Sequence, residues 1–143
     1  MQAFVFEVAN RPGELARVSD VAAQHAINIE AFCLGYGNRG ITAFLTPDEK
    51  GLKSVLTSEG ISYKEIPLLT IWLEDKPGTT HLVAKRLADA GVNIEFFAPV
   101  DFQTDRRATF AIGVDKIDAA RTALSDQLVE WKVPEMAYAS SRS

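Results

Sequence analysis

Four polar positions are the residues of this chain best able to bind a small polar molecule. Asn10 stands just before a Pro-Gly turn, and Asn28 lies 18 positions after Asn10. In the second half of the chain, Asp75 and Asn93 repeat this pattern with the same separation. An asparagine carries a donor and an acceptor on one short side chain, so it suits a small ligand that presents both a cationic and an anionic group. An ionised aspartate only accepts, so the site at Asp75 is expected to differ from the site at Asn10.

The turn that contains Asn10 is expected to lead into a helix. The free N–H groups and the positive dipole end of a helix N-terminus favour a carboxylate, and Gly13 leaves room for close approach. The alternative is purely structural, because Asn and Asp are common in turns and caps without any ligand, and Asn28 and Asn93 stand at a helix-to-strand boundary. The recurrence of both features at one spacing favours a ligand role.

An internal repeat organises the whole chain. At an offset of 65, residues 10–13 align with residues 75–78, and residues 27–30 align with residues 92–95 without a gap. Two extra residues in the second copy then move the offset to 67, at a place where a turn is expected. A period of this length indicates a duplicated small α+β domain.

Each copy predicts the order βαββαβ. Alternating apolar residues predict strands, and apolar residues at spacings of three and four predict a helix after each Pro-Gly turn and another before each closing strand. The predicted strands are residues 3–8, 28–34, 41–46 and 61–66 in the first copy and 69–73, 93–100, 108–114 and 129–133 in the second. The predicted fold class is therefore α+β, with two ferredoxin-like units side by side in one eight-stranded antiparallel sheet and their helices on one face.

The expected domain organisation follows from the repeat. One unit covers residues 1–67 and the other covers 68–133, with Pro67 directly between two strands and no linker. Residues 134–143 are small and polar at their end, and a frayed tail is expected there.

The motifs around the two turns resemble the signature of ACT domains, the regulatory modules of many enzymes of amino-acid metabolism. The resemblance extends to about Trp131 and departs at Asp75, and Val8 and Leu73 stand where some members have a histidine. It implies a stand-alone pair of ACT units that binds an amino acid at an interface between two such units. It implies the following ligand-binding residues: Asn10, Arg11, Pro12, Gly13, Asn28, Ile29, Asp75, Lys76, Pro77, Gly78, Asn93 and Ile94.

The leading functional hypothesis is an amino-acid-binding regulatory protein whose conformation is sensed by an enzyme of amino-acid metabolism or another regulator. A pure protein-interaction module without a ligand and a small enzyme are the alternatives. The sequence groups no nucleophile, base and orienting residue, so no catalytic residue is expected. No cofactor and no metal site are expected either, since the single cysteine, Cys33, has no CxxC or Cys/His partners.

The composition narrows the range of partners and compartments. A formal net charge of −4 and a pI of about 5.2 argue against a nucleic-acid surface. The absence of a long apolar run argues against a membrane span, and a cytoplasmic location is expected.

The strand alternation also predicts an apolar sheet face without helices. Phe4, Phe6 and Val8 are expected to face the helices, together with the small apolar side chain of Cys33. The side chains expected on the opposite face are Val5, Phe32, Leu34, Trp72 and Phe97. Such a face usually marks an interface, so a homodimer formed through it is expected.

Overall fold

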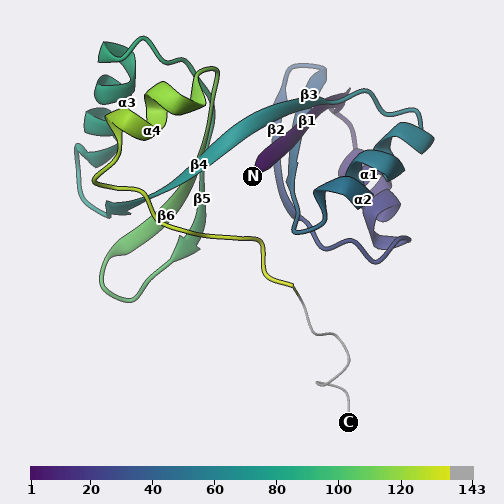
Figure 1. Cartoon of the computed structure of the whole chain (residues 1–143). Coiled ribbons are helices and arrows are strands. Elements are labelled where there is room, and N and C mark those ends of the chain that lie inside the picture. Colours follow the sequence, from purple (N-terminus) through teal and green to yellow (C-terminus); the bar gives the residue numbers. More distant parts are fainter. Residues whose placement is uncertain (136–143) are drawn as a thin grey trace. The chain divides into compact units, whose positions relative to one another are not determined.

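The computed structural model describes residues 1–135, and residues 136–143, which hold most of the predicted tail, lie outside the described part (Figure 1). Four helices and six strands are present in the described residues. They are β1 (Gln2–Ala9), α1 (Glu14–Ala23), β2 (Glu30–Tyr36), β3 (Arg39–Leu45), α2 (Glu49–Ser58), β4 (Lys64–Glu74), α3 (Thr79–Asp89), β5 (Ile94–Phe102), β6 (Arg107–Val114) and α4 (Ile117–Ala123).

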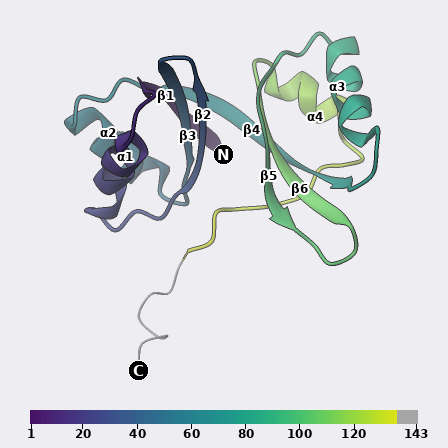
Figure 2. The ribbon, with the colours of Figure 1, turned by 180° about the vertical axis from the view of Figure 1, so that it is seen from behind.

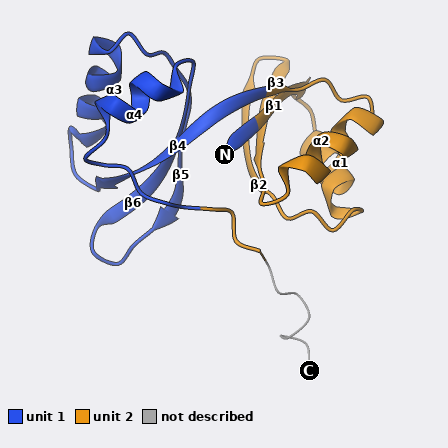
Figure 3. Cartoon of the chain, in the orientation of Figure 1, with its two compact units in different colours: residues 1–3, 65–131 blue, residues 4–64, 132–143 orange. Residues whose placement is uncertain are grey.

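The chain forms two compact units that exchange their ends (Figure 3). Unit 1 consists of Met1–Ala3 and Glu65–Trp131. Within the described residues, unit 2 consists of Phe4–Lys64 and residues 132–135. In unit 2, α1 and α2 cover one face of antiparallel strands; in unit 1, α3 and α4 do the same (Figures 1 and 2). The strands are hydrogen-bonded in the order β2-β3-β1-β4-β6-β5.

The prediction of eight strands was wrong, because two predicted strands form one. The strands predicted at 61–66 and 69–73 are both parts of β4, which runs without interruption through Pro67. Proline fits an extended strand and is tolerated where no main-chain donor is needed. The next residue, Leu68, donates its N–H to the carbonyl of Met1 at 2.9 Å, so the pairing resumes immediately.

The eighth predicted strand, at 129–133, is reduced to a short paired stretch. Leu128 forms an isolated bridge with Ile71, and the Val129 N–H donates to the carbonyl of Thr70 at 3.0 Å. The chain leaves unit 1 after Trp131, which ends the pairing before a regular strand develops. The α+β class and the antiparallel pairing agree with the sequence, and the number of strands is six.

Each unit has its own apolar core between its helices and strands. In unit 2 the rings of Phe6 and Phe44 meet edge to face with centroids 5.1 Å apart, so the predicted inward orientation of Phe4 and Phe6 is confirmed. Further buried members of the unit 2 core are Val18, Ala22, Ile27, Leu52, Val55 and Leu56. The buried core of unit 1 consists of Leu69, Ile71, Leu73, Val83, Leu87, Val92, Ile112, Val114, Ala120 and Leu124.

Phe97 lies on the helix-covered side of unit 1, opposite to its prediction. A register irregularity separates Ile94 from Phe96, after which Phe97 pairs with Ile112 and packs against the core. An extra residue in one strand reverses the alternation of side chains beyond it, so Ile94 and Phe97 both face the helices. The aligned residue Phe32 lies in a strand without such an irregularity.

Cys33 is exposed, which corrects the prediction that it packs as a small apolar residue. It belongs to β2, the first strand in the sheet order, and an edge strand has a neighbour on one side only. The hydroxyl of Thr42 in β3 lies 3.8 Å from its sulfur.

None of the helices in residues 1–135 is long and apolar enough to cross a membrane.

Candidate functional site

The first predicted turn rests on the hairpin between β2 and β3. The main-chain N–H of Asn10 donates to the carbonyl of Asn38 at 3.0 Å, and its side-chain Nδ2 donates to the carbonyl of Gly37 at 2.9 Å. A Cβ at Gly35 would lie 2.7 Å from that nitrogen, so the hairpin is closely fitted to the Asn10 amide. The side-chain oxygen of Asn10 accepts no hydrogen bond from the described residues.

Helix α1 begins at this turn without a side-chain cap. Gly13 adopts a left-handed conformation with φ of 88°, and no side chain accepts a hydrogen bond from the first turn of the helix. In contrast, Asp48 caps α2 by accepting from the Gly51 N–H at 2.9 Å. The first N–H groups of α1 therefore keep their capacity to bind an anion.

Glu14, in the first turn of α1, joins two arginines. Its carboxylate is 9% exposed and lies 2.8 Å from the guanidinium of Arg11 and 2.8 Å from that of Arg17. The hydrogen bond from Arg17, followed by that from Arg11, lowers the pKa of Glu14 below its usual value. One carboxylate thus balances two guanidiniums and leaves a surplus positive charge at the start of α1.

The second turn repeats the geometry of the first with different side chains. The Asp75 N–H donates to the carbonyl of Arg106 at 2.7 Å, and Gly78 is left-handed with φ of 94°. Thr79, at the position of Glu14, donates its hydroxyl to the carbonyls of Glu74 at 3.0 Å and Lys76 at 3.1 Å. Helix α3 also begins without a side-chain cap.

Asn28 and Asn93 fasten the second strand of each unit to the end of the third. The carbonyl of Asn28 accepts from the Thr46 hydroxyl at 2.8 Å, and the Asn93 N–H donates to the Asp115 carboxylate at 2.8 Å. The side-chain Nδ2 of Asn28 also donates to the carbonyl of Pro134 at 2.7 Å. Ile29 and Ile94, which follow them, pack against the two cores.

The structure does not bring Asn10 and Asn28 together within unit 2. Asn10 follows the end of β1 that pairs with Arg39, whereas Asn28 precedes the end of β2 that pairs with Leu45. These positions mark opposite ends of β3 and are separated by about 20 Å, given a rise of about 3.3 Å per residue. The pairing of β4 and β5 with β6 separates Asp75 from Asn93 in the same way.

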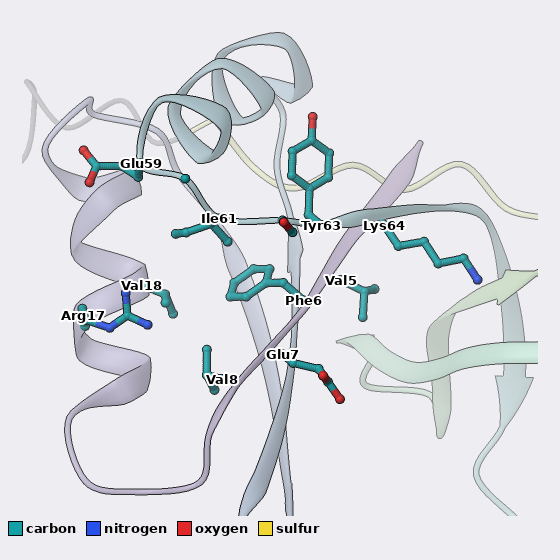
Figure 4. A pocket seen from close by; sticks show the side chains of 12 residues that line it. Val5, Phe6, Glu7, Val8, Arg17, Val18, Glu59, Ile61, Tyr63 and Lys64 are labelled. Atoms are coloured by element: carbon teal, nitrogen blue, oxygen red, sulfur yellow. The ribbon is translucent and has the colours of Figure 1, made fainter.

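Each unit also contains a cavity that the sequence did not reveal. In unit 2 a cavity of about 550 Å³ lies between β1, α1 and the segment that follows α2, with Arg17 and Glu59 among its lining residues (Figure 4). In unit 1 a cavity of about 350 Å³ is lined by Arg86 and Asp126. The two residues of each pair are far apart in the sequence and belong to no recognisable motif. Only the folded chain shows that Arg17 shares a cavity with Glu59 and that Arg86 shares one with Asp126.

Within residues 1–135, no three His, Cys, Asp or Glu side chains are grouped in a way that could hold a metal ion. No family model matches the chain. No curated protein matches it either.

Several solved structures share its fold. Protein BT0572 from Bacteroides thetaiotaomicron is 20% identical, with 90% of each chain covered and a TM-score of 0.72. The ligand-free regulatory subunit of aspartate kinase from Thermus thermophilus is also 20% identical, over 87% of this chain and 90% of that one, with a TM-score of 0.60. E. coli aspartokinase III in complex with lysine and aspartate is 14% identical over 87% of this chain and 31% of that one, with a TM-score of 0.54.

At these identities the likeness concerns the fold. The two Pro-Gly turns, the antiparallel strands and the helices on one face of each unit agree with it. The chain therefore has an ACT-like α+β fold.

Proposed function

We propose that the protein is a regulatory protein that binds a free amino acid. The observation that carries this proposal is the duplicated turn, in which a left-handed glycine, Gly13 or Gly78, opens a helix that has no side-chain cap. The first N–H groups of such a helix and its positive dipole end attract a carboxylate. The fold shared with a regulatory subunit of aspartate kinase supports the same role.

The residue before each turn would recognise the ammonium group of the ligand. Asn10 commits its side-chain nitrogen to Gly37, which leaves its oxygen as an acceptor. Asp75 occupies the same position in the second turn and would accept with a full negative charge. The two sites would therefore bind related ligands with unequal affinity.

A ligand held by the turns would bind between two ACT units and not within one. Asn10 and Asn28 of unit 2 stand about 20 Å apart, and the ammonium and carboxylate of one amino acid cannot reach both. The turn of one unit would therefore act with the Asn28 or Asn93 position of another, in line with the resemblance of residues 1–67 and 68–133 to ACT domains. E. coli aspartokinase III, which shares the fold, was solved with lysine and aspartate.

A thermal-shift screen with the common amino acids tests this function. One or a few amino acids should raise the melting temperature, because a ligand that binds only the folded state stabilises it. Asn10→Ala and Asn28→Ala should each reduce the rise, whereas Gln24→Ala, which removes an exposed amide at the other end of α1, should leave it intact. A flat response to every amino acid would contradict the proposal.

The regulatory role also requires a partner that senses the ligand. We propose an enzyme of amino-acid metabolism or another regulator in that role, together with self-association through the sheet face opposite the helices. Leu34 is 70% exposed and Tyr36 84% exposed on β2, and Ile41 beside them on β3 is 38% exposed. Contiguous apolar side chains of this kind are typical of an interface.

A further inference from the structure

The cavity of unit 2 has the size and the position of a ligand site separate from the two turns. Its volume is about 550 Å³, within the range of about 300–1,000 Å³ found for small-molecule sites. It lies beside the half of β1 that contains Phe6 and Val8, between that strand, α1 and the segment 59–64 (Figure 4). All of its lining residues belong to unit 2.

One part of the cavity is apolar. Phe6, Val8, Val18 and Ile61 lie together between the strand and the helix in Figure 4. Val8 and Ile61 are only partly buried where they pack against the core, so they keep apolar surface open to the cavity, whereas Phe6 and Val18 are buried in that core. This surface suits an aliphatic or aromatic group of a ligand.

Two opposite charges accompany the apolar part. Arg17 on α1 and Glu59 beside the end of α2 lie on the same side of the apolar group in Figure 4. Glu7 and Lys64, the other charged lining residues, point away from it. A zwitterion placed here would therefore meet Arg17 and Glu59 rather than the other charged side chains.

Arg17 keeps a capacity to bind a carboxylate. It donates Nε and Nη2 to the Glu14 carboxylate, which leaves the hydrogens of Nη1 available. Glu14 is shared with Arg11, so the charge of Arg17 is only partly compensated.

Glu59 suits an ammonium group. Its carboxylate forms no ion pair with the described residues. Glu59 is also the C-cap residue of α2, where the negative end of the helix dipole adds to the attraction for a cation.

The corresponding cavity in unit 1 contains an arginine that is already paired. Arg86 on α3 donates to the Gln127 side chain and to the Asp126 carboxylate, each at 2.7 Å. The Trp72 N–H in β4 donates to the Gln127 carbonyl at 3.0 Å, which fixes the segment to the strand. The cavity there is smaller, about 350 Å³, and its arginine is neutralised.

We propose that the unit 2 cavity binds an amino acid with an apolar side chain. The ligand carboxylate binds Arg17, its ammonium binds Glu59, and its side chain packs against the partly buried Val8 and Ile61. The inference rests on the proposed function for the class of ligand, but it assigns a site inside one unit that uses neither Asn10 nor Asn28.

Isothermal titration of the full chain with L-leucine tests the site. Arg17→Met and Glu59→Gln should each weaken binding roughly tenfold or more, because each removes a charge-assisted hydrogen bond. The matched controls are Arg121→Met, which removes an exposed arginine on α4 of unit 1, and Glu130→Gln, which removes an exposed carboxylate elsewhere. Both controls should bind leucine as the unchanged protein does.

Ligand analogues supply a second test. Leucinamide lacks the carboxylate, 4-methylpentanoate lacks the ammonium, and lysine lacks a purely apolar side chain, so all three should bind at least tenfold more weakly than leucine. Equal effects of Arg17→Met and Arg121→Met would overturn the proposal, as would the absence of saturable binding of leucine.

The same titrations separate this inference from the proposed function. Loss of leucine binding in Arg17→Met with full binding in Asn10→Ala supports the cavity and contradicts binding at the turn. The reverse pattern supports the turn and overturns the cavity. Failure of every amino acid to bind contradicts both.

Discussion

The side-chain nitrogen of Asn10 donates a hydrogen bond to the main-chain carbonyl of Gly37 at 2.9 Å. This contact joins the turn before α1 to the tip of the β2–β3 hairpin. Asn10 therefore has a structural function whether or not a ligand binds, and its oxygen is the part of the side chain left for recognition. Any change that moves the hairpin tip is expected to move this oxygen as well.

Gly35→Ala should lower the free energy of unfolding by about 1–3 kcal/mol, the usual effect of forcing an extra methyl into a packed place. The new Cβ would stand 2.7 Å from Nδ2 of Asn10. Urea unfolding measures the loss, and the same substitution in an Asn10→Ala background should lose much less, because the colliding amide is then absent. An equal loss in both backgrounds would show that the clash lies elsewhere.

Gly13→Ala should destabilise the protein by about 1–2 kcal/mol through the backbone alone, since a left-handed residue with a Cβ is strained by that amount. Gly13 has φ of 88°, and nothing lies within 4 Å of a Cβ built there. Gly13→Asn should lose less, because asparagine tolerates left-handed geometry better than alanine. Thermal or urea unfolding measures the loss of stability of the two variants. Equal losses in Gly13→Ala and Gly13→Asn would argue against backbone strain as the cause.

Glu14→Gln should destabilise the protein at pH 7, and the difference should disappear in acid. Hydrogen bonds from Arg17 and Arg11 lower the pKa of Glu14 in the folded state, so its ionised form stabilises the fold above the ordinary glutamate pKa of about 4.3. That contribution is lost as the pH falls below this value and through the lowered pKa. Unfolding measured at pH 7, 5 and 3 follows the loss, with Glu130→Gln as an exposed control; a difference that does not shrink between pH 5 and pH 3 would exclude the ionised carboxylate as its source.

Tyr36→Lys should weaken self-association if the sheet face opposite the helices is the interface. A lysine placed in a buried apolar contact introduces a charge without a partner, which opposes association. Sedimentation at micromolar concentration should show a shift toward monomer, whereas Leu82→Lys, at a 60% exposed position on α3, should leave the distribution unchanged. A strict monomer before any substitution would contradict the proposed interface.

Local signals in the sequence predicted most of the secondary structure. The Pro-Gly turns, the apolar spacing of the helices and the repeat at offset 65 are patterns within a few residues or between two copies, and α1 and α3 begin directly after Gly13 and Gly78 as expected. The sequence pattern does not predict the fusion of two strands into β4, because a proline such as Pro67 usually marks a strand boundary although it is compatible with an extended strand. Phe97 was misplaced because a strand irregularity leaves no trace in the alternation.

The candidate sites depend on contacts that alternation and spacing do not encode. Asn10 and Asn28 are equal candidates for a ligand role on sequence grounds, but only the strand register reveals that they occupy opposite ends of unit 2. Arg17 and Glu59 meet at one cavity because α1 and the end of α2 lie on the same side of β1. No local rule in the sequence relates those two residues.

The exchange of chain ends between the units has a practical and evolutionary meaning. Cleavage at residue 67 would divide the repeat neatly but would separate Met1–Ala3 from unit 1 and Lys132–Glu135 from unit 2. Val133, which is 2% exposed, and the Pro134 carbonyl that binds Asn28 would be lost from the N-terminal fragment. The duplicated halves have thus become interdependent, and neither is expected to reproduce its unit when expressed alone.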